Sequence, residues 1–146
     1  METIFLHKEL ESINDFEKYK EKMKAHLVDD MALSDHLHDL LDSKGLDKKN
    51  VKADALRFMS KSYFNQIFNE KKTKDISRNF ILVLAFALKL NREEADKVLK
   101  LADVATLSPR KIRDSLIIIA LNNGMSLLEA DDMLASEDLI TIAKYN

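Results

Sequence analysis

Apolar residues recur at spacings of three and four along most of the chain, and this spacing places them on one face of a helix. The first stripe begins with Ile13, Phe16 and Tyr19. We expect helices over 12–27, 34–44, 49–57, 61–69, 78–90, 92–102, 112–121, 127–135 and 136–144. Residues 1–11 are mixed in character and form either a short first helix or an arm. Because no pattern in the sequence indicates a β-hairpin, we predict an all-α fold.

Polar residues at the starts of these stripes support the predicted helices. Three pairs fit the capping box, in which a side-chain acceptor lies three residues before a carboxylate. These pairs are Ser12 with Asp15, Asn91 with Glu94, and Ser126 with Glu129. We also expect Ser34, Ser60 and Ser136 to begin helices, and Ser108-Pro109 to begin one with proline in its first turn. Gly45 is expected to end the helix before it, because glycine accepts a left-handed backbone.

The segment LIIIAL at 116–121 permits two interpretations. Its β-branched residues favour a strand on propensity alone. The Asn-Asn-Gly sequence at 122–124 would end a helix, so we expect a buried helix over 112–121. Isoleucines at 117–119 point in three successive directions around such a helix. The helix is therefore either central in one chain or shared between two copies.

Composition agrees with one helical unit. The 146 residues are 46% hydrophobic, enough for a core, and include two glycines and one proline. Few helix breakers favour long helices with short connections. We divide the chain into an N-terminal helical extension (1–33), a core (34–105) and a C-terminal helical extension (106–146) that packs on the core.

Several classes of function are not expected. The chain has no cysteine, which excludes disulfides and thiolate chemistry. Charges occur too early in METIFLHKELES for a signal peptide, and no apolar run approaches the roughly 20 residues of a membrane span. We therefore expect a cytoplasmic protein without membrane contact. No nucleophile–base pattern or glycine-rich phosphate cradle is present, so we expect neither an enzyme nor a cofactor.

His36 and His38, with Asp35 and Asp39 beside them, suggest a metal site at first sight. Residues two apart on a helix, however, point about 200° away from each other. Helical metal sites use spacings of three or four instead. We expect a partly exposed histidine pair and no metal.

Charge is distributed unevenly along the chain. The net charge is −2, yet the run from Lys44 to Arg78 holds ten Lys or Arg against four Asp or Glu. This run is therefore strongly basic within an acidic protein. A local positive patch suits a nucleic-acid surface. The alternative is an ordinary solvated face, since lysine is mostly exposed in any protein.

The basic run also fits two short helices joined by a tight turn. Residues 34–102 resemble the phage-repressor-like (Cro/repressor type) helix-turn-helix family. The resemblance lies in LSDHLHDLLDSKGL, the turn Phe58-Met59-Ser60, KSYFNQIFNEKK and SRNFILVLAFALKLNREEADKVLKLA. The segment SPRKIRDSLIIIALNNGMSLLEADDML looks like an extension found in bacterial versions of such regulators. This resemblance implies a sequence-specific DNA-binding transcriptional regulator, which would act as a homodimer on two half-sites of double-stranded DNA.

In such a fold, the helix after the turn anchors on the core and exposes its N-terminal residues to base edges. Phe64, Ile67 and Phe68 are the expected anchors. The expected base contacts are Ser60, Lys61, Ser62, Tyr63, Asn65 and Gln66. The expected phosphate contacts are Lys49, Lys52, Lys71, Lys72 and Lys74. Asn and Gln can pair with adenine, whereas lysines position the protein on phosphates. Tyr63 has a second interpretation, in which it covers the edge of the core.

Two positions depart from the family pattern. Phe58 occupies a turn position where the family often has glycine, and Glu70 follows the recognition helix where glycine is also frequent. A carboxylate beside phosphate oxygens is repulsive. These departures keep open an alternative, in which the chain is a helical protein-interaction or adaptor module that has kept the fold but not DNA binding.

Overall fold

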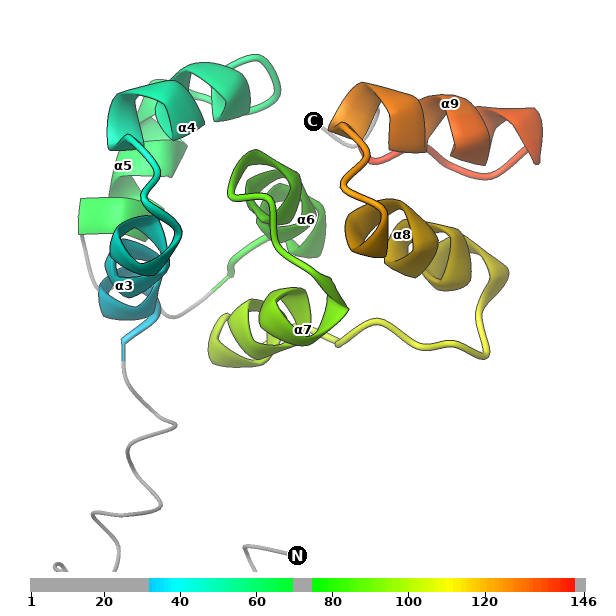
Figure 1. Cartoon of the computed structure of the whole chain (residues 1–146), viewed down its shortest axis with the longest axis horizontal. Helices are drawn as coiled ribbons and strands as arrows, with labels where there is room; N and C mark the ends of the chain where they lie inside the picture. Colours follow the sequence, from blue (N-terminus) through cyan, green and yellow to red (C-terminus); the bar gives the residue numbers. More distant parts are fainter. Residues whose placement is uncertain (1–31, 70–74, 144–146) are drawn as a thin grey trace, which may run out of the picture. The chain divides into compact units, whose positions relative to one another are not determined.

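The computed structural model describes residues 32–69 and 75–143, which contain seven helices and no strand (Figure 1). The helices are α3 (Leu33–Lys44), α4 (Lys48–Ala55), α5 (Lys61–Asn69), α6 (Arg78–Ala87), α7 (Arg92–Leu101), α8 (Ile112–Asn122) and α9 (Leu127–Ser136). The prediction of an all-α fold is confirmed for this part of the chain. The helix expected over 12–27 and the lysines Lys71, Lys72 and Lys74 lie outside the described residues. No helix in the described ranges is long and apolar enough to cross a membrane.

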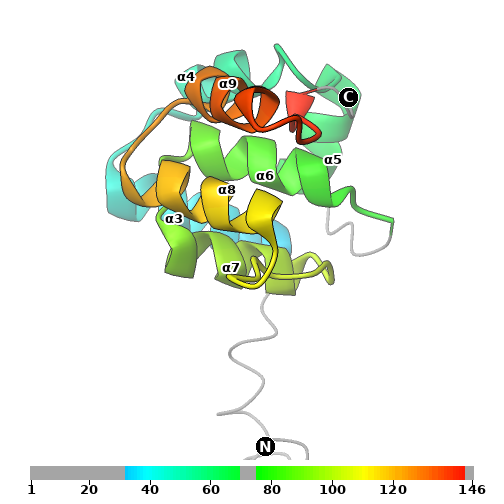
Figure 2. The same cartoon turned by 90° about the vertical axis from the view of Figure 1, so that its right-hand side faces the viewer.

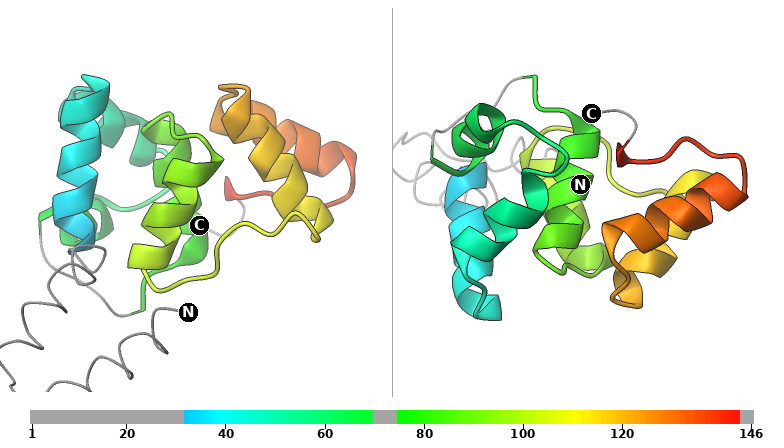
Figure 3. Two further views of the ribbon diagram at one scale, coloured as in Figure 1. Left: turned by 60° about the horizontal axis from the view of Figure 1, so that its bottom comes forward. Right: turned by 90° about the horizontal axis from the view of Figure 1, so that it is seen from above.

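Helix α6 is the centre of the compact unit formed from Ala32 onward. Every residue from Ile81 to Phe86 is buried, as expected for a helix surrounded by others. Helices α4, α7 and α9 all pack against α6. Figures 1 and 3 show it between the group α3–α5 and the pair α8–α9.

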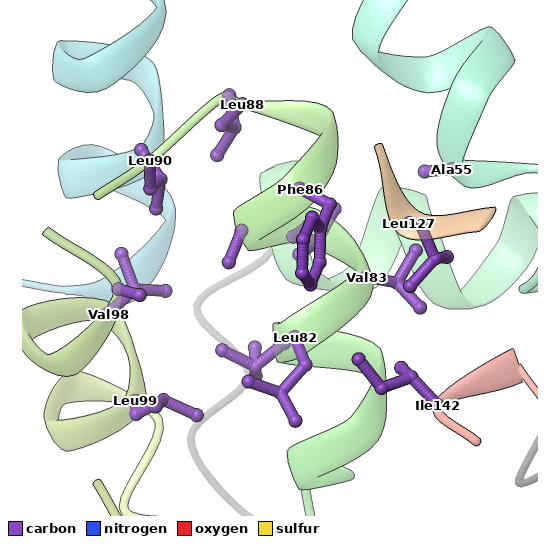
Figure 4. Close-up of a cluster of buried hydrophobic side chains, with 14 of the residues drawn as sticks. Ala55, Leu82, Val83, Phe86, Leu88, Leu90, Val98, Leu99, Leu127 and Ile142 are labelled. Carbon is purple, nitrogen blue, oxygen red and sulfur yellow. The ribbon is translucent and has the colours of Figure 1, made fainter. Parts of the chain in front are cut away.

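Side chains from distant parts of the sequence meet around α6. In Figure 4, Val83 of α6 lies next to Leu127 of α9. Leu90, after the end of α6, lies in the same view near Val98 of α7. Ile142 is completely buried although it follows the last helix. The core thus joins the predicted core segment and the C-terminal extension into one apolar interior.

Most predicted helix boundaries agree with the structure. Asn91 and Glu94 form a reciprocal capping box, with N–H to side-chain oxygen distances of 3.0 and 2.9 Å. Ser126 and Glu129 form the second. Gly45 ends α3 in the left-handed region at φ 63°. These signals are local in sequence, so the pattern alone reveals them.

Ser34 and Ser108-Pro109 do not begin helices as expected. Ser34 lies inside α3, which begins one residue earlier at Leu33, and both residues are buried. Ser108-Pro109 forms a turn, and α8 begins only at Ile112. The Ser108 hydroxyl accepts the N–H of Arg110 in this turn.

The helix expected over 136–144 is absent from the described part of that range. Helix α9 continues to Ser136, whose hydroxyl donates back to the Met133 carbonyl instead of capping a new helix. Asp138 then reverses the chain at φ 57°. The Asp131 carboxylate accepts the N–H groups of Ile142 and Ala143, at 2.7 and 3.0 Å. This carboxylate holds the segment against α9, and no α-helix forms in the described part of it.

The helices α4 and α6 are shorter than predicted. Asp47 caps α4 by accepting the N–H of Lys49, and the helix ends at Ala55, before the expected Arg57. Helix α6 ends at Ala87, and Lys89 adopts φ 56° instead of continuing to Leu90. The early end of α4 also changes its inner face, because Val51 and Ala55 are buried as predicted whereas Leu56, which we expected to face inward, is exposed.

Candidate nucleic-acid interface

Helix α5 is anchored by three buried side chains. Phe64, Ile67 and Phe68 are each at most 1% exposed. The rings of Phe64 and Phe68 stack with centroids 4.4 Å apart, and His38 of α3 meets Phe68 edge-on. The Nε2 of His38 lies 2.9 Å from the Phe68 carbonyl oxygen, to which it can donate a hydrogen bond. The position of α5 is therefore fixed by aromatic packing along its inner face and by a polar contact near its C-terminus.

The N-terminal end of α5 is exposed. Ser60, Lys61 and Ser62 are all exposed, and the Ser60 hydroxyl accepts the N–H of Tyr63 at 3.1 Å, which confirms Ser60 as a cap. No acidic residue lies in the first turn of α5. The N-terminus of a helix attracts anions through its free N–H groups and its dipole. This end of α5 therefore has the charge and accessibility that a phosphate or a base edge requires.

Tyr63 faces the protein interior. Its ring lies 4.4 Å from the ring of Phe80, and its hydroxyl oxygen accepts the N–H of Ser77 at 2.8 Å. Ser77 precedes α6 and makes no side-chain cap of its own. Tyr63 thus binds the backbone N–H of the residue before α6 and covers the edge of the core.

The other residues predicted to contact DNA differ in how exposed they are. Asn65 and Gln66 are half-buried on α5. Lys49 is exposed at the start of α4. Lys52 is half-buried, with its Nζ 5.9 Å from the centre of the Phe64 ring. The amine of Lys48 donates to the Asn69 side chain at 2.8 Å, so this lysine connects α4 to the end of α5.

The connection between α4 and α5 runs from Leu56 to Ser60. It is five residues long, whereas helix-turn-helix motifs typically have a turn of three or four. Met59 is buried, and the N–H groups of Phe58 and Met59 both donate to the Ala55 carbonyl. No residue of this connection has a positive φ, so the backbone at Phe58 does not require glycine.

Arg57 is a candidate contact that we did not predict from the sequence. It lies exposed in this connection, with its guanidinium 5.7 Å from the centre of the Phe58 ring. Its place in the basic run was visible in the sequence. Because we predicted a helix through residue 57, however, we did not expect this residue to lie in an exposed turn.

The histidine pair has separate environments. Burial and then the positive charge of Lys97 lower the pKa of His36, although Asp39 raises it. His38 contacts Phe68 instead. Within 32–69 and 75–143, no three His, Asp or Glu side chains are grouped so that they could hold a metal ion.

Comparisons of the chain with protein-family models, curated proteins and solved structures find no match.

Proposed function

We propose that the chain is a sequence-specific DNA-binding transcriptional regulator of the repressor-like helix-turn-helix type, acting in the cytoplasm. Helix α5 is the proposed recognition helix, and α4 precedes it across the connection 56–60. Ser60, Lys61 and Ser62 contact the DNA first, followed by the accessible parts of Asn65 and Gln66. Lys49 and Lys52 contact phosphates from α4, together with Lys71, Lys72 and Lys74.

The main support for the proposal is that α5 has a buried inner face and an exposed N-terminal end. Its inner face is fixed on the core by Phe64, Ile67 and Phe68, while its N-terminal end is exposed, basic and free of acids. A recognition helix enters the major groove with its N-terminal residues at the base edges, so it needs this combination. We assign Tyr63 to positioning α6 instead of base contact, because its hydroxyl already bonds the Ser77 N–H.

A second candidate function is a helical protein-interaction module. The five-residue connection favours it, because it departs from the usual turn, and so do Asn65 and Gln66, because these residues are half-buried. On this alternative the basic run is a solvated face or a docking surface for an acidic protein.

Binding to random-sequence duplex DNA, followed by fluorescence polarisation at two salt concentrations, tests the proposal. Non-specific binding comes almost entirely from phosphate contacts, and its affinity falls steeply with salt. We expect Lys49→Glu/Lys61→Glu to weaken binding at least ~10-fold and to reduce the salt slope by at least about one, because the phosphate contact of Lys49 is lost.

The matched control is Lys97→Glu/Lys100→Glu. Both lysines are exposed on α7, and the change in charge is identical. If both double variants lose affinity equally, the effect is one of net charge and α5 is not the contact surface. If the wild-type chain does not bind at low salt, the DNA proposal fails and the interaction module replaces it.

A further inference from the structure

Helix α8 has two apolar faces. Ile117, Ala120 and Leu121 are buried against the rest of the unit. On the opposite side, Ile112 is 71% exposed and Ile119 is 48% exposed. Leu116 lies between them in the sequence and on the same face, half-buried. Figure 2 looks toward the side of the unit on which α8 and α9 lie, with α8 in front of α6.

The polar side chains beside this outer stripe already make hydrogen bonds within the chain. Ser115 lies on its edge, and its hydroxyl donates to the Pro109 carbonyl at 2.9 Å. Asn123, one turn beyond Ile119, donates its amide to the Ile119 carbonyl at 2.7 Å. No charged residue interrupts the stripe between Ile112 and Ile119, because Arg113 and Asp114 point elsewhere and bond to Asn79 and Arg78. Covering the stripe would therefore remove apolar surface from water without burying a charge.

The spacing of the stripe suits a second copy of itself. Ile112 and Ile119 are seven residues apart, and the midpoint between them lies next to Leu116. In an antiparallel pair about a two-fold axis, Ile112 of each copy would face Ile119 of the other, and the two Leu116 side chains would meet at the axis. A two-fold interface uses the same patch on both copies, which this symmetric arrangement provides.

The charges at the start of α8 also favour an antiparallel neighbour. Arg110 and Lys111 are exposed immediately before the helix, where the positive end of its own dipole disfavours them. In an antiparallel pair they would lie near the C-terminal end of the other α8, at the negative end of its dipole. Lys111 already interacts favourably with the Asp114 carboxylate of its own helix, and an antiparallel neighbour would add a favourable interaction for both Arg110 and Lys111.

We propose that α8 pairs antiparallel with α8 of a second copy through Ile112, Leu116 and Ile119. The proposed function leads us to expect a dimer, and this surface would form its interface. The pairing itself does not depend on DNA binding. A contact through one pair of helices is smaller than the interfaces of permanent dimers. The association is therefore reversible, with a dissociation constant of about 10–100 µM.

Sedimentation velocity of the full chain without DNA tests the pairing. We expect the wild type to change from monomer to dimer over this concentration range, and Ile119→Glu to remain monomeric because it would bury two carboxylates. Leu128→Glu is the matched control, since Leu128 of α9 is 47% exposed against 48% for Ile119. Its dimer should form as in the wild type. A wild type that stays monomeric, or a dimer that survives Ile119→Glu, overturns the proposal.

Cysteine cross-linking tests the antiparallel register without relying on a disruptive variant. The natural chain has no cysteine, so each introduced thiol is unique. We expect Leu116→Cys to form a disulfide between copies, and Ile112→Cys to cross-link to a tagged Ile119→Cys chain. Ile112→Cys alone should not cross-link, because the two positions would be about 10 Å apart along the helices, too far for a disulfide. Efficient cross-linking of Ile112→Cys to itself would instead show a parallel pair and overturn the proposal.

The two proposals fail separately. A dimer without DNA affinity would leave the α8 pairing intact and refute the function of α5. A monomer that binds duplex DNA, with loss on Lys49→Glu/Lys61→Glu, would refute the pairing alone.

Discussion

Lys89, Asp103 and Asp138 adopt positive φ angles of 56–58° immediately after helices α6, α7 and α9. In each case the next residue donates its N–H back into the helix, as Leu90 does to the Ala85 carbonyl at 2.9 Å. This is the Schellman type of helix end, where glycine is the usual residue. The chain uses glycine at such a position after α3 but not after these three helices. Three helix ends therefore store backbone strain.

Lys89→Gly should stabilise the protein. A non-glycine residue with a left-handed backbone costs roughly 1 kcal/mol, and part of this gain is offset by the greater freedom of glycine in the unfolded chain. We expect a net gain of about 0.5 kcal/mol in the free energy of unfolding, measured by urea denaturation. The control Lys97→Gly lies inside α7 and should instead lose about 1 kcal/mol. If Lys89→Gly were as destabilising as Lys97→Gly, side-chain contacts of Lys89 would outweigh its backbone strain.

At the scale of single residues, the sequence predicts local interactions whose two partners lie close together in the chain. The capping boxes at Asn91 and Ser126 are examples, since each partner is three residues away. Ser108 shows why other signals mislead. Its N–H donates to Asp114, and that carboxylate is held in turn by Arg78, 36 residues away. A residue pattern cannot reveal a turn that is decided by a distant guanidinium.

The connection between α7 and α8 is held by the half-buried Arg78 and the buried Asp114. The guanidinium of Arg78 donates to the Ala105 and Thr106 carbonyls and pairs with Asp114, with an N–O distance of 3.0 Å. The Asp114 carboxylate also accepts the Ser108 N–H. Because Arg78 begins α6 and Asp114 lies in the first turn of α8, this ion pair fixes the C-terminal helices to the central helix.

This arrangement lowers the pKa of Asp114. Burial by itself raises the pKa of the carboxyl group, but the hydrogen bonds from Arg78 and Ser108, with the charges of Arg78 and Lys111, outweigh it and lower the pKa. A folded-state pKa below the unfolded value means that the unfolded chain binds the proton more readily. The stability contributed by Asp114 is therefore present above about pH 4 and is lost as the pH falls through the folded-state pKa.

Asp114→Asn should destabilise the protein and flatten its response to acid. At pH 7 we expect a loss of about 3 kcal/mol, because Arg78 would keep a partly buried charge without its partner. The difference from the wild type should shrink below about pH 4, where Asp114 of the unfolded chain binds a proton before the folded carboxylate does. Thermal unfolding between pH 7 and pH 3 measures both effects, with Asp132→Asn, exposed on α9, as control. A difference that stays constant over this range would show that the charge of Asp114 is unimportant.

At the scale of elements, the apolar stripes predict where helices form but not their neighbours. Ile81–Phe86 is apolar throughout, and the pattern alone did not identify its helix as the centre of the unit. The isoleucines of α8 allowed a central or a shared helix, and the structure exposes Ile119 while burying Ile117. The candidate site was likewise predicted only in part. The anchors of α5 were identified, but the hydrogen bond from the Ser77 N–H to Tyr63 was not, since it depends on packing between helices.

At the scale of the whole molecule, the two proposals reinforce each other. A single helix reads few bases, and a pair of α8 helices alone associates weakly. Two linked weak contacts bind more tightly than either because the second becomes intramolecular. We therefore expect Ile119→Glu to weaken binding to a two-half-site duplex while leaving its affinity for random DNA nearly unchanged. Polarisation titrations of the two duplexes make the comparison, and equal loss on both would show that α8 does not link the two half-sites.

The central position of α6 has a consequence for how the unit opens. Its backbone amides are shielded by α4, α7 and α9, so local fraying of one neighbour does not expose its whole length. We expect the amide protons of residues 82–87 to exchange with solvent more slowly than those of any other described segment. By native-state hydrogen exchange, their opening free energy should equal the free energy of global unfolding. Slower exchange in α7 than in α6 would contradict this. A protein built in this way unfolds as one unit, so the segment after residue 105 cannot be removed without uncovering the most protected helix.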